Sequence, residues 1–168
     1  SRSTGLLIKF GTIQGKRIKN SSNVSLPNSE KIDSYIKVQH LEDQKVNLLH
    51  GRTVTYGSGK EWYGDYFKTT RKKEYTSSFN FNDLVPNTNA KIKIAFAGRS
   101  DLWTELFLQV DKISKKVDIR NTNTSDVEDD IARETQQSFE LPLSSSSTLA
   151  ISYPTINSPS EGWLNFIT

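Results

Sequence analysis

Apolar and polar residues alternate along most of the second half of the chain, which is the pattern of half-buried β-strands. Residues 104–110 show it most clearly, because Leu106, Leu108 and Val110 all fall on one side of an extended segment. Turn-forming residues separate such segments, and no long helical period intervenes. The pattern predicts an all-β protein, an antiparallel jelly-roll-like β-sandwich with long loops. The predicted strands lie at 32–40, 75–81, 90–96, 104–110, 116–120, 136–143, 148–153 and 162–167.

The first third of the chain is less regular. Short apolar-basic runs over 5–10 and 16–19 indicate an opening hairpin or an edge pair of strands. Mixed apolar spacing over 42–50 favours a short helical turn. We therefore predict an N-terminal extension or edge hairpin over 1–30 and a β-sandwich domain over 31–168.

The stretch 57–67 holds four aromatic residues and three glycines and follows no simple period. It predicts an ordered loop that lies over one face or end of the domain and runs into a strand near Tyr66. We expect Trp62 to be largely buried, because flanking glycines let this backbone lie close to a sheet. In one interpretation Trp62 and Phe67 simply fill a core, and in the other Trp62, Tyr63 and Tyr66 form a binding surface.

Composition removes several kinds of chemistry. The chain has no cysteine, which excludes disulfides, thiolate zinc sites and a cysteine nucleophile. It has only two histidines, His40 and His50, and no nucleophile-elbow motif, so a serine triad is not expected. The net charge of +3 arises from 22 basic and 19 acidic side chains, a mixed surface that does not favour nucleic-acid binding. No apolar run is long enough for a membrane span. The chain lacks methionine and begins Ser-Arg-Ser, which we interpret as a processed product or an excised piece.

Three groups of residues are candidates for chemistry or binding. Glu61 and Asp65 bracket two aromatic residues, an arrangement typical of glycoside hydrolases, in which sugars stack on aromatic rings while two acids transfer protons, but loop acids more often bond neighbouring groups. Arg99 and Trp103 lie in a polar run at a strand entrance, and Trp103 is the better candidate for a sugar-stacking platform. An acidic run is a weak candidate for calcium because its spacing does not match a calcium loop, and we expect no metal and no cofactor. The acidic residues are Asp126, Glu128, Asp129 and Asp130.

Several short motifs occur in an order that resembles the PorU-like sortases, the gingipain-related C25-type cysteine peptidases of the type IX secretion system in Bacteroidetes. The main one is Glu-Trp-Tyr-Gly-Asp at 61–65, after a glycine and a lysine. Gly98 and Asn165 stand where the resemblance leads us to expect Ala and Asp. The other matching segments are 15–18, 40–42, 47–49, 84–87, 92–96, 97–100, 132–134 with Phe139, and 162–167.

The resemblance is to the non-catalytic region ahead of the peptidase domain. It implies a binding or scaffolding β-sandwich that is not itself an enzyme, because the catalytic Cys and His of such a sortase belong to another domain. That family removes C-terminal secretion signals from cargo proteins and joins the cargo to surface lipopolysaccharide. The expected location is extracytoplasmic, in the periplasm or at the outer-membrane surface. The expected partners are adjacent domains of the parent chain or secretion-system proteins. The residues themselves leave a carbohydrate-binding module, with a glycan as its ligand, and a β-sandwich glycoside hydrolase as alternatives.

Overall fold

The computed structural model describes residues 33–48, 61–126, 128–154 and 159–168. The predicted opening hairpin and His50 lie outside these residues. The chain divides into two units, residues 1–35 and 36–168, and the second of them contains all the secondary structure described here. Among the described residues, no helix has the length and apolar character needed to cross a membrane.

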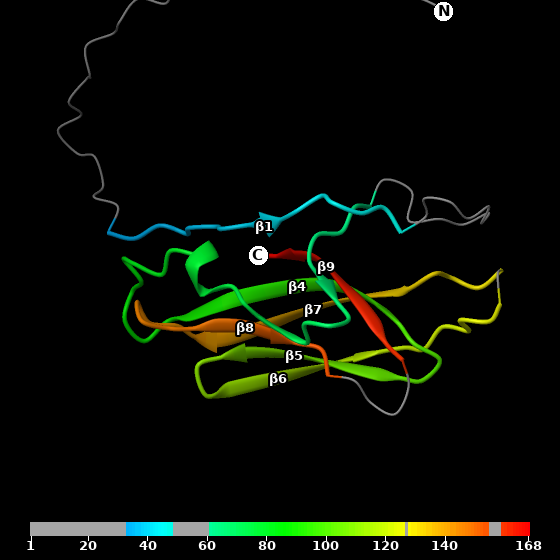
Figure 1. Ribbon diagram of the computed structural model, residues 1–168. Coiled ribbons are helices and arrows are strands. Elements are labelled where there is room, and N and C mark those ends of the chain that lie inside the picture. The colour runs from blue at the N-terminus through cyan, green and yellow to red at the C-terminus, as the bar shows by residue number, and fades with distance from the viewer. Residues whose placement is uncertain (1–32, 49–60, 127, 155–158) are drawn as a thin grey trace, which may run out of the picture. The chain divides into compact units, whose positions relative to one another are not determined.

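The second unit consists of two antiparallel sheets packed face to face, which confirms the predicted all-β sandwich. The first sheet has the order β1-β9-β4-β7, with β2 also paired to β9, and the second has the order β3-β8-β5-β6. Figure 1 shows β4 and β7 in one layer and β5 and β6 in the layer below them. The strands are β1 Leu41–Glu42, β2 Tyr66–Phe67, β3 Lys72–Glu74, β4 Asn89–Arg99, β5 Thr104–Val110, β6 Ile113–Ile119, β7 Arg133–Pro142, β8 Leu149–Ser152 and β9 Glu161–Ile167.

The core lies between the sheets and follows the predicted alternation. In β5 every second residue, from Thr104 to Val110, is buried, as the sequence pattern indicated. The two sheets contribute aliphatic side chains from β4, β5, β6, β8 and β9, with an aromatic group at one end. In that group Phe96 contacts Tyr153 at 5.1 Å between ring centroids and Phe67 at 5.4 Å. The buried hydroxyl of Tyr153 donates a hydrogen bond to Thr104, so its polar end is satisfied.

Strand β9 joins most of the first sheet. One of its edges pairs along β4, and the other pairs with β2 near its start and with β1 near its end. The register with β4 shifts between Ala95 and Phe96, which face Phe166 and Leu164, so Asn165 is an extra residue in β9. Such a β-bulge shifts the alternation of side chains by one residue. As a result, Leu164 before the bulge and Ile167 after it both lie in the core.

The strand predicted over 32–40 is wrong for the residues described. Residues 33–40 form no strand, and β1 begins at Leu41. The apolar side chains that suggested an inward face are exposed, Ile36 to 92% and Val38 to 71%. Alternation shows only that one side of an extended segment would be apolar. A segment with this pattern does not join a sheet unless a neighbouring strand pairs with it.

Two further predictions are corrected by backbone hydrogen bonds. Of the helical turn predicted over 42–50, residues 43–47 form none, because the backbone of Val46 forms an isolated β-bridge with Tyr63; residues 49–50 lie outside the described residues. The strand predicted over 75–81 is also wrong: β3 ends at Glu74 and a 3-10 helix, η1 Thr76–Ser78, follows. The aromatic residues of that segment still pack inward, which produced the misleading period.

Candidate functional site

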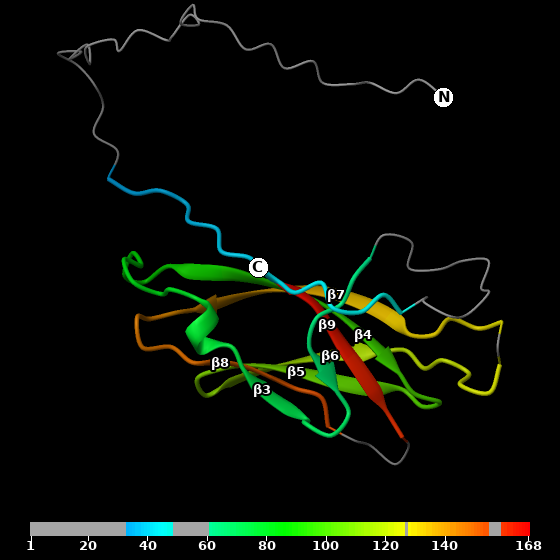
Figure 2. The same ribbon diagram turned by 45° about the horizontal axis from the view of Figure 1, so that its top comes forward.

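The segment 61–67 lies along β9 and is held there by backbone hydrogen bonds, so it is an ordered part of the fold. Gly64 N–H donates to the carbonyl of Leu164 at 2.8 Å, and Leu164 N–H donates to the carbonyl of Asp65 at 2.9 Å. A carbon added to Gly64 would lie 2.7 Å from the carbonyl oxygen of Asp43, so the close approach here requires glycine. Figure 2 shows this segment descending beside β9. The predicted loop that runs into a strand at Tyr66 is confirmed for these residues.

Tyr63 reaches from this segment onto the outer face of the first sheet. The sheet register aligns Glu134 of β7, Ala97 of β4 and Trp163 of β9 in one row across the strands. Tyr63 is only 3% exposed and packs against Ala97 and Trp163. The small side chain of Ala97 leaves room for the ring, and the hydroxyl donates to Glu134 Oε2 at 2.6 Å.

Asn165, the bulge residue, completes the polar side of this group. Its Nδ2 donates to Glu61 Oε2 at 2.9 Å and lies 3.4 Å from Glu134 Oε2. The side chain is only 4% exposed, so the amide bridges two carboxylates from distant parts of the chain. We call the four residues Glu61, Tyr63, Glu134 and Asn165 the bridging cluster.

Burial raises the pKa of Tyr63 above its usual value, and the hydrogen bond to Glu134 and the charges of Glu134 and Glu61 raise it further. The phenol therefore stays protonated at all physiological pH values and acts as a hydrogen-bond donor. In this arrangement the hydroxyl and the amide position the two glutamates. Among the described residues, no group of three or more histidine, aspartate or glutamate side chains is placed to hold a metal ion.

Two members of the bridging cluster, Glu134 and Asn165, were not among the site residues predicted from the sequence. Glu134 lies at the start of β7 and Asn165 lies within an apolar strand, so neither has a local pattern that marks it. The available signal was the resemblance itself, in which Glu134 lies in the motif at 132–134 and Asn165 in the motif at 162–167, separate from the motif at 61–65. Only the pairing of β7, β4 and β9 brings those motifs together.

The other aromatic residues of the stretch differ in environment. The prediction that Trp62 is largely buried is wrong, since its side chain is 42% exposed. Phe67 is fully buried in the core, and Tyr66 is partly exposed and stacks on Trp163 at 5.3 Å between ring centroids. Pairing with β9 decides the difference between Tyr66 and Phe67, because it turns adjacent residues of a strand toward opposite faces of the sheet.

Glu61 and Asp65, the predicted acid pair, have separate partners. Asp65 accepts hydrogen bonds from Lys73 Nζ and from the Tyr75 hydroxyl, both at 2.9 Å. Burial alone would raise the pKa of Asp65, but the bonds from Lys73 and Tyr75 outweigh it and hold the pKa below its usual value. Glu61 is joined instead to Asn165, as described above. His40 lies at an exposed edge between Glu42 and Thr168.

We expect Asp65→Asn to lower stability at pH 7 by about 1 kcal/mol, because a charged acceptor is lost while partial exposure limits its value. A folded-state pKa below the unfolded value means that the carboxylate stabilises the fold above about pH 4 and that this stabilisation disappears as pH falls through the folded pKa. Urea unfolding at pH 7 and at pH 2.5 should therefore show the variant and wild type converging in acid. Asp118→Asn, in a more exposed pair with Lys116, is the control and should change little. A difference as large at pH 2.5 as at pH 7 would contradict the assignment.

Arg99 and Trp103 lie at the end of the sandwich where β4 leads into β5. Arg99 is half-buried on β4, opposite Glu161 in the register. Trp103 is 57% exposed, with the guanidinium of Arg120 5.9 Å from its ring centroid, and the neighbouring Leu102 is also exposed. The turn beneath them is fixed, since Thr122 N–H donates to the Ser100 carbonyl at 2.8 Å.

The acidic loop uses its carboxylates locally. Asp129 accepts from the backbone N–H of Asn123 at 2.6 Å and pairs with Arg133, which also contacts Asp130. Asp126 accepts from the backbone N–H of Glu128 at 2.9 Å. These bonds organise the turn between β6 and β7.

Neither the protein-family models nor the curated protein sequences contain a match. Among solved structures, dimeric latent PorU from Porphyromonas gingivalis matches with a TM-score of 0.53 and 13% sequence identity over 77% of this chain. The carbohydrate-binding module CBM36, solved in complex with calcium and xylotriose, matches with a TM-score of 0.39 and 11% identity over 78% of this chain and 98% of its own. The match covers only 12% of the PorU chain, so this chain corresponds in fold to a small β-sandwich part of that protein.

Proposed function

We propose that this chain is a non-catalytic binding and scaffolding module of a PorU-like surface sortase, equivalent to the region ahead of the peptidase domain. The proposal rests on which residues form the bridging cluster and its apolar neighbours. The motifs on which the sequence resemblance rests are far apart in the chain, yet they meet at this one place. The residues concerned are Leu48, Glu61, Tyr63, Ala97, Ala132, Glu134, Trp163 and Asn165.

The chemistry of the cluster supports a structural role. The Tyr63 hydroxyl donates to Glu134, and the Asn165 amide donates to Glu61. These bonds attach the segment 61–67 to β7 and β9, and with the buried pair Tyr63 and Trp163 they fix it on the sheet. A segment fixed in this way makes the first sheet rigid, and a rigid frame is what a scaffold requires.

The docking surface that we propose is the exposed pair Leu102 and Trp103. Two adjacent large apolar side chains on a fixed turn are typical of interface anchors, and tryptophan is enriched among residues that dominate binding energy. The occupant that we propose is the peptidase domain of the parent chain, in an extracytoplasmic location. The chain itself has no cysteine and so cannot supply the nucleophile of a C25-type enzyme.

The reading frame that encodes this chain is the first test. A C25-type peptidase domain downstream is the expected result, and a glycoside hydrolase there would contradict the proposal. The second test measures binding of this chain to that peptidase domain by biolayer interferometry. Trp103→Ala should weaken binding by about 30-fold, the effect of losing an interface anchor of about 2 kcal/mol.

Trp62→Ala is the matched control for this experiment, because it removes another partly exposed tryptophan from a different part of the surface. Its affinity should equal that of the wild type. Equal losses for the two variants would contradict Leu102 and Trp103 as the docking surface. No binding by the wild type would contradict the scaffold proposal itself.

A further inference from the structure

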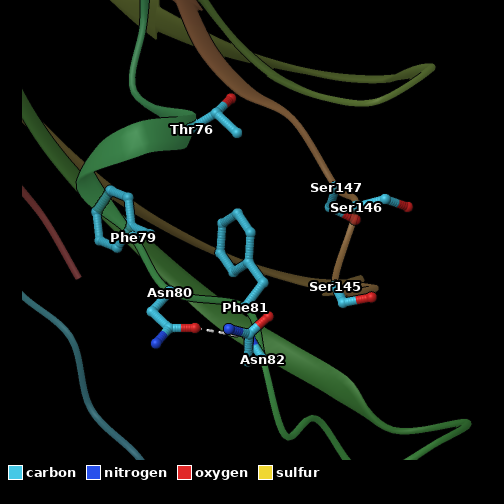
Figure 3. A pocket seen from close by; sticks show the side chains of 8 residues that line it. All are labelled: Thr76, Phe79, Asn80, Phe81, Asn82, Ser145, Ser146 and Ser147. Atoms are coloured by element: carbon cyan, nitrogen blue, oxygen red, sulfur yellow. Dashed lines mark hydrogen bonds between the residues drawn. The ribbon is translucent and has the colours of Figure 1, made fainter.

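A cavity of about 360 Å³, widely open to solvent, lies away from the bridging cluster, between the segment that follows η1 and the serine-rich loop before β8. Figure 3 shows Phe79 and Phe81 standing side by side, with Phe81 between Phe79 and the serines. The volume falls near the lower end of the range for small-molecule sites, on the order of 300–1,000 Å³. A ligand of one or two small rings therefore fits.

The two phenylalanine rings form an ordered apolar wall. They are nearly parallel, with an interplanar angle of 8° and 6.2 Å between centroids. Both pack partly against the hydrophobic core, which holds their orientation. The exposed face of such a stacked pair accepts the C–H face of a sugar ring, because both surfaces are apolar.

The opposite edges of the cavity carry neutral polar groups with unused hydrogen-bonding capacity. Asn80 Oδ1 accepts from the backbone N–H of Asn82 at 2.8 Å, and its Nδ2 has no partner within the described part of the chain. Among the described residues, the side-chain amide of Asn82 and the hydroxyl of Ser145 also have no hydrogen-bond partner. Amides and hydroxyls both donate and accept, as sugar hydroxyls do, so the two sets match.

The walls are held in place before any ligand binds. Asn80 is clasped by Gln39, which donates to its carbonyl at 2.7 Å and accepts from its N–H at 2.6 Å. On the serine side, Ser147 donates to Asp111 at 2.8 Å, and Asp111 also accepts from the N–H of Thr148 at 2.7 Å. Such preorganisation reduces the entropy cost of binding.

The cavity lining contains no charged side chain. A site for a phosphate, an acidic sugar or a peptide terminus would offer a balancing charge, as buried or bound ions require one. We propose that this cavity binds a neutral carbohydrate, with Phe79 and Phe81 stacking on a sugar ring and Asn80, Asn82 and Ser145 bonding its hydroxyls. This site is separate from the exposed tryptophans and does not depend on the function proposed above.

Titration of the whole chain with neutral trisaccharides (cellotriose, maltotriose, laminaritriose and mannotriose) tests the proposal, with trigalacturonate as the charged comparison. Binding is followed by calorimetry and by ¹H–¹⁵N NMR of the asparagine side-chain amides. The expected result is binding of at least one neutral sugar, with shifts at Asn80 and Asn82. Asn82→Asp adds a charge with almost no change in shape and should weaken binding by about tenfold or more, with an unchanged thermal midpoint. Phe81→Ala should weaken it similarly.

Because Phe81 also contacts the core, Asn82→Asp and Ser145→Ala keep the test valid if Phe81→Ala unfolds. Trp103→Ala is the control and should bind the sugar as the wild type does. Failure of every neutral sugar to bind at 10 mM, on the order of the weakest specific affinities, would overturn the proposal. It would also be overturned if trigalacturonate bound as tightly, or if Trp103→Ala abolished binding while Asn82→Asp did not.

Discussion

Replacing Phe67 by alanine is expected to lower the free energy of unfolding by about 3–5 kcal/mol, the range for a large aromatic residue removed from a core. Phe67 is fully buried, and its ring meets the edge of Phe96 at 5.4 Å between centroids. Its backbone pairs with Gly162 of β9, so the residue cannot move to fill the space that the ring leaves. Urea unfolding followed by tryptophan fluorescence measures the loss as a shift of the midpoint.

Trp62→Ala is the natural comparison, because the two residues lie in the same short stretch. Trp62 is 42% exposed. Trp62→Ala should therefore lower the free energy of unfolding by less than about 1 kcal/mol, close to the range for surface positions. Equal losses for the two variants would show that both rings support the core and would contradict the burial described here.

Gly162→Ala is expected to destabilise the protein by about 1–3 kcal/mol or more, as overpacking of a well-filled core does. A β-carbon at this position would lie 2.4 Å from Cζ and 2.6 Å from Cε1 of Phe96, and 3.0 Å from Cδ1 of Tyr153. Both rings are fully buried, so neither can turn away into solvent. The measurement is again the free energy of unfolding in urea.

A double-mutant cycle identifies the cause. Phe96→Leu removes the two ring atoms that the new methyl group would strike, so the double variant should be less destabilised than the sum of the single changes. A purely additive result would contradict the steric explanation. Gly98, which pairs with Gly162, has a related constraint: a β-carbon there would lie 2.8 Å from Cγ2 of Ile119. This contact disfavours an alanine at Gly98.

The strands from β4 onward were predictable because each has an apolar side that faces the core. The alternation over 104–110 matches the burial of β5, whereas 162–167 matches β9 only in its bounds, because β9 is buried on both faces. Prediction failed where burial depends on a distant strand. Ile36 and Val38 alternate as well as β5 does, yet no strand lies beside them among the described residues, and they are exposed.

The candidate site was predictable only in part, for the same reason. Tyr63 was named from its local composition, and the structure places it at the centre of the bridging cluster. Asn165 could not have been recognised as its neighbour, because its direction depends on a bulge relative to β4. A sequence pattern carries no information about a one-residue shift in the pairing of strands that are far apart in the chain.

The position of β9 in the first sheet has a consequence for the folding kinetics. The hairpin of β5 and β6 closes through a short local turn, whereas β9 must meet β1, β2 and β4, which are distant in the chain. Folds dominated by such non-local pairs fold slowly, because the entropy of closing long loops is lost before the contacts form. The amide protons of β9 should thus acquire protection from solvent exchange later than those of β5 and β6. The bridging cluster, which depends on β9, would then assemble only after the hairpin of β5 and β6 had already formed.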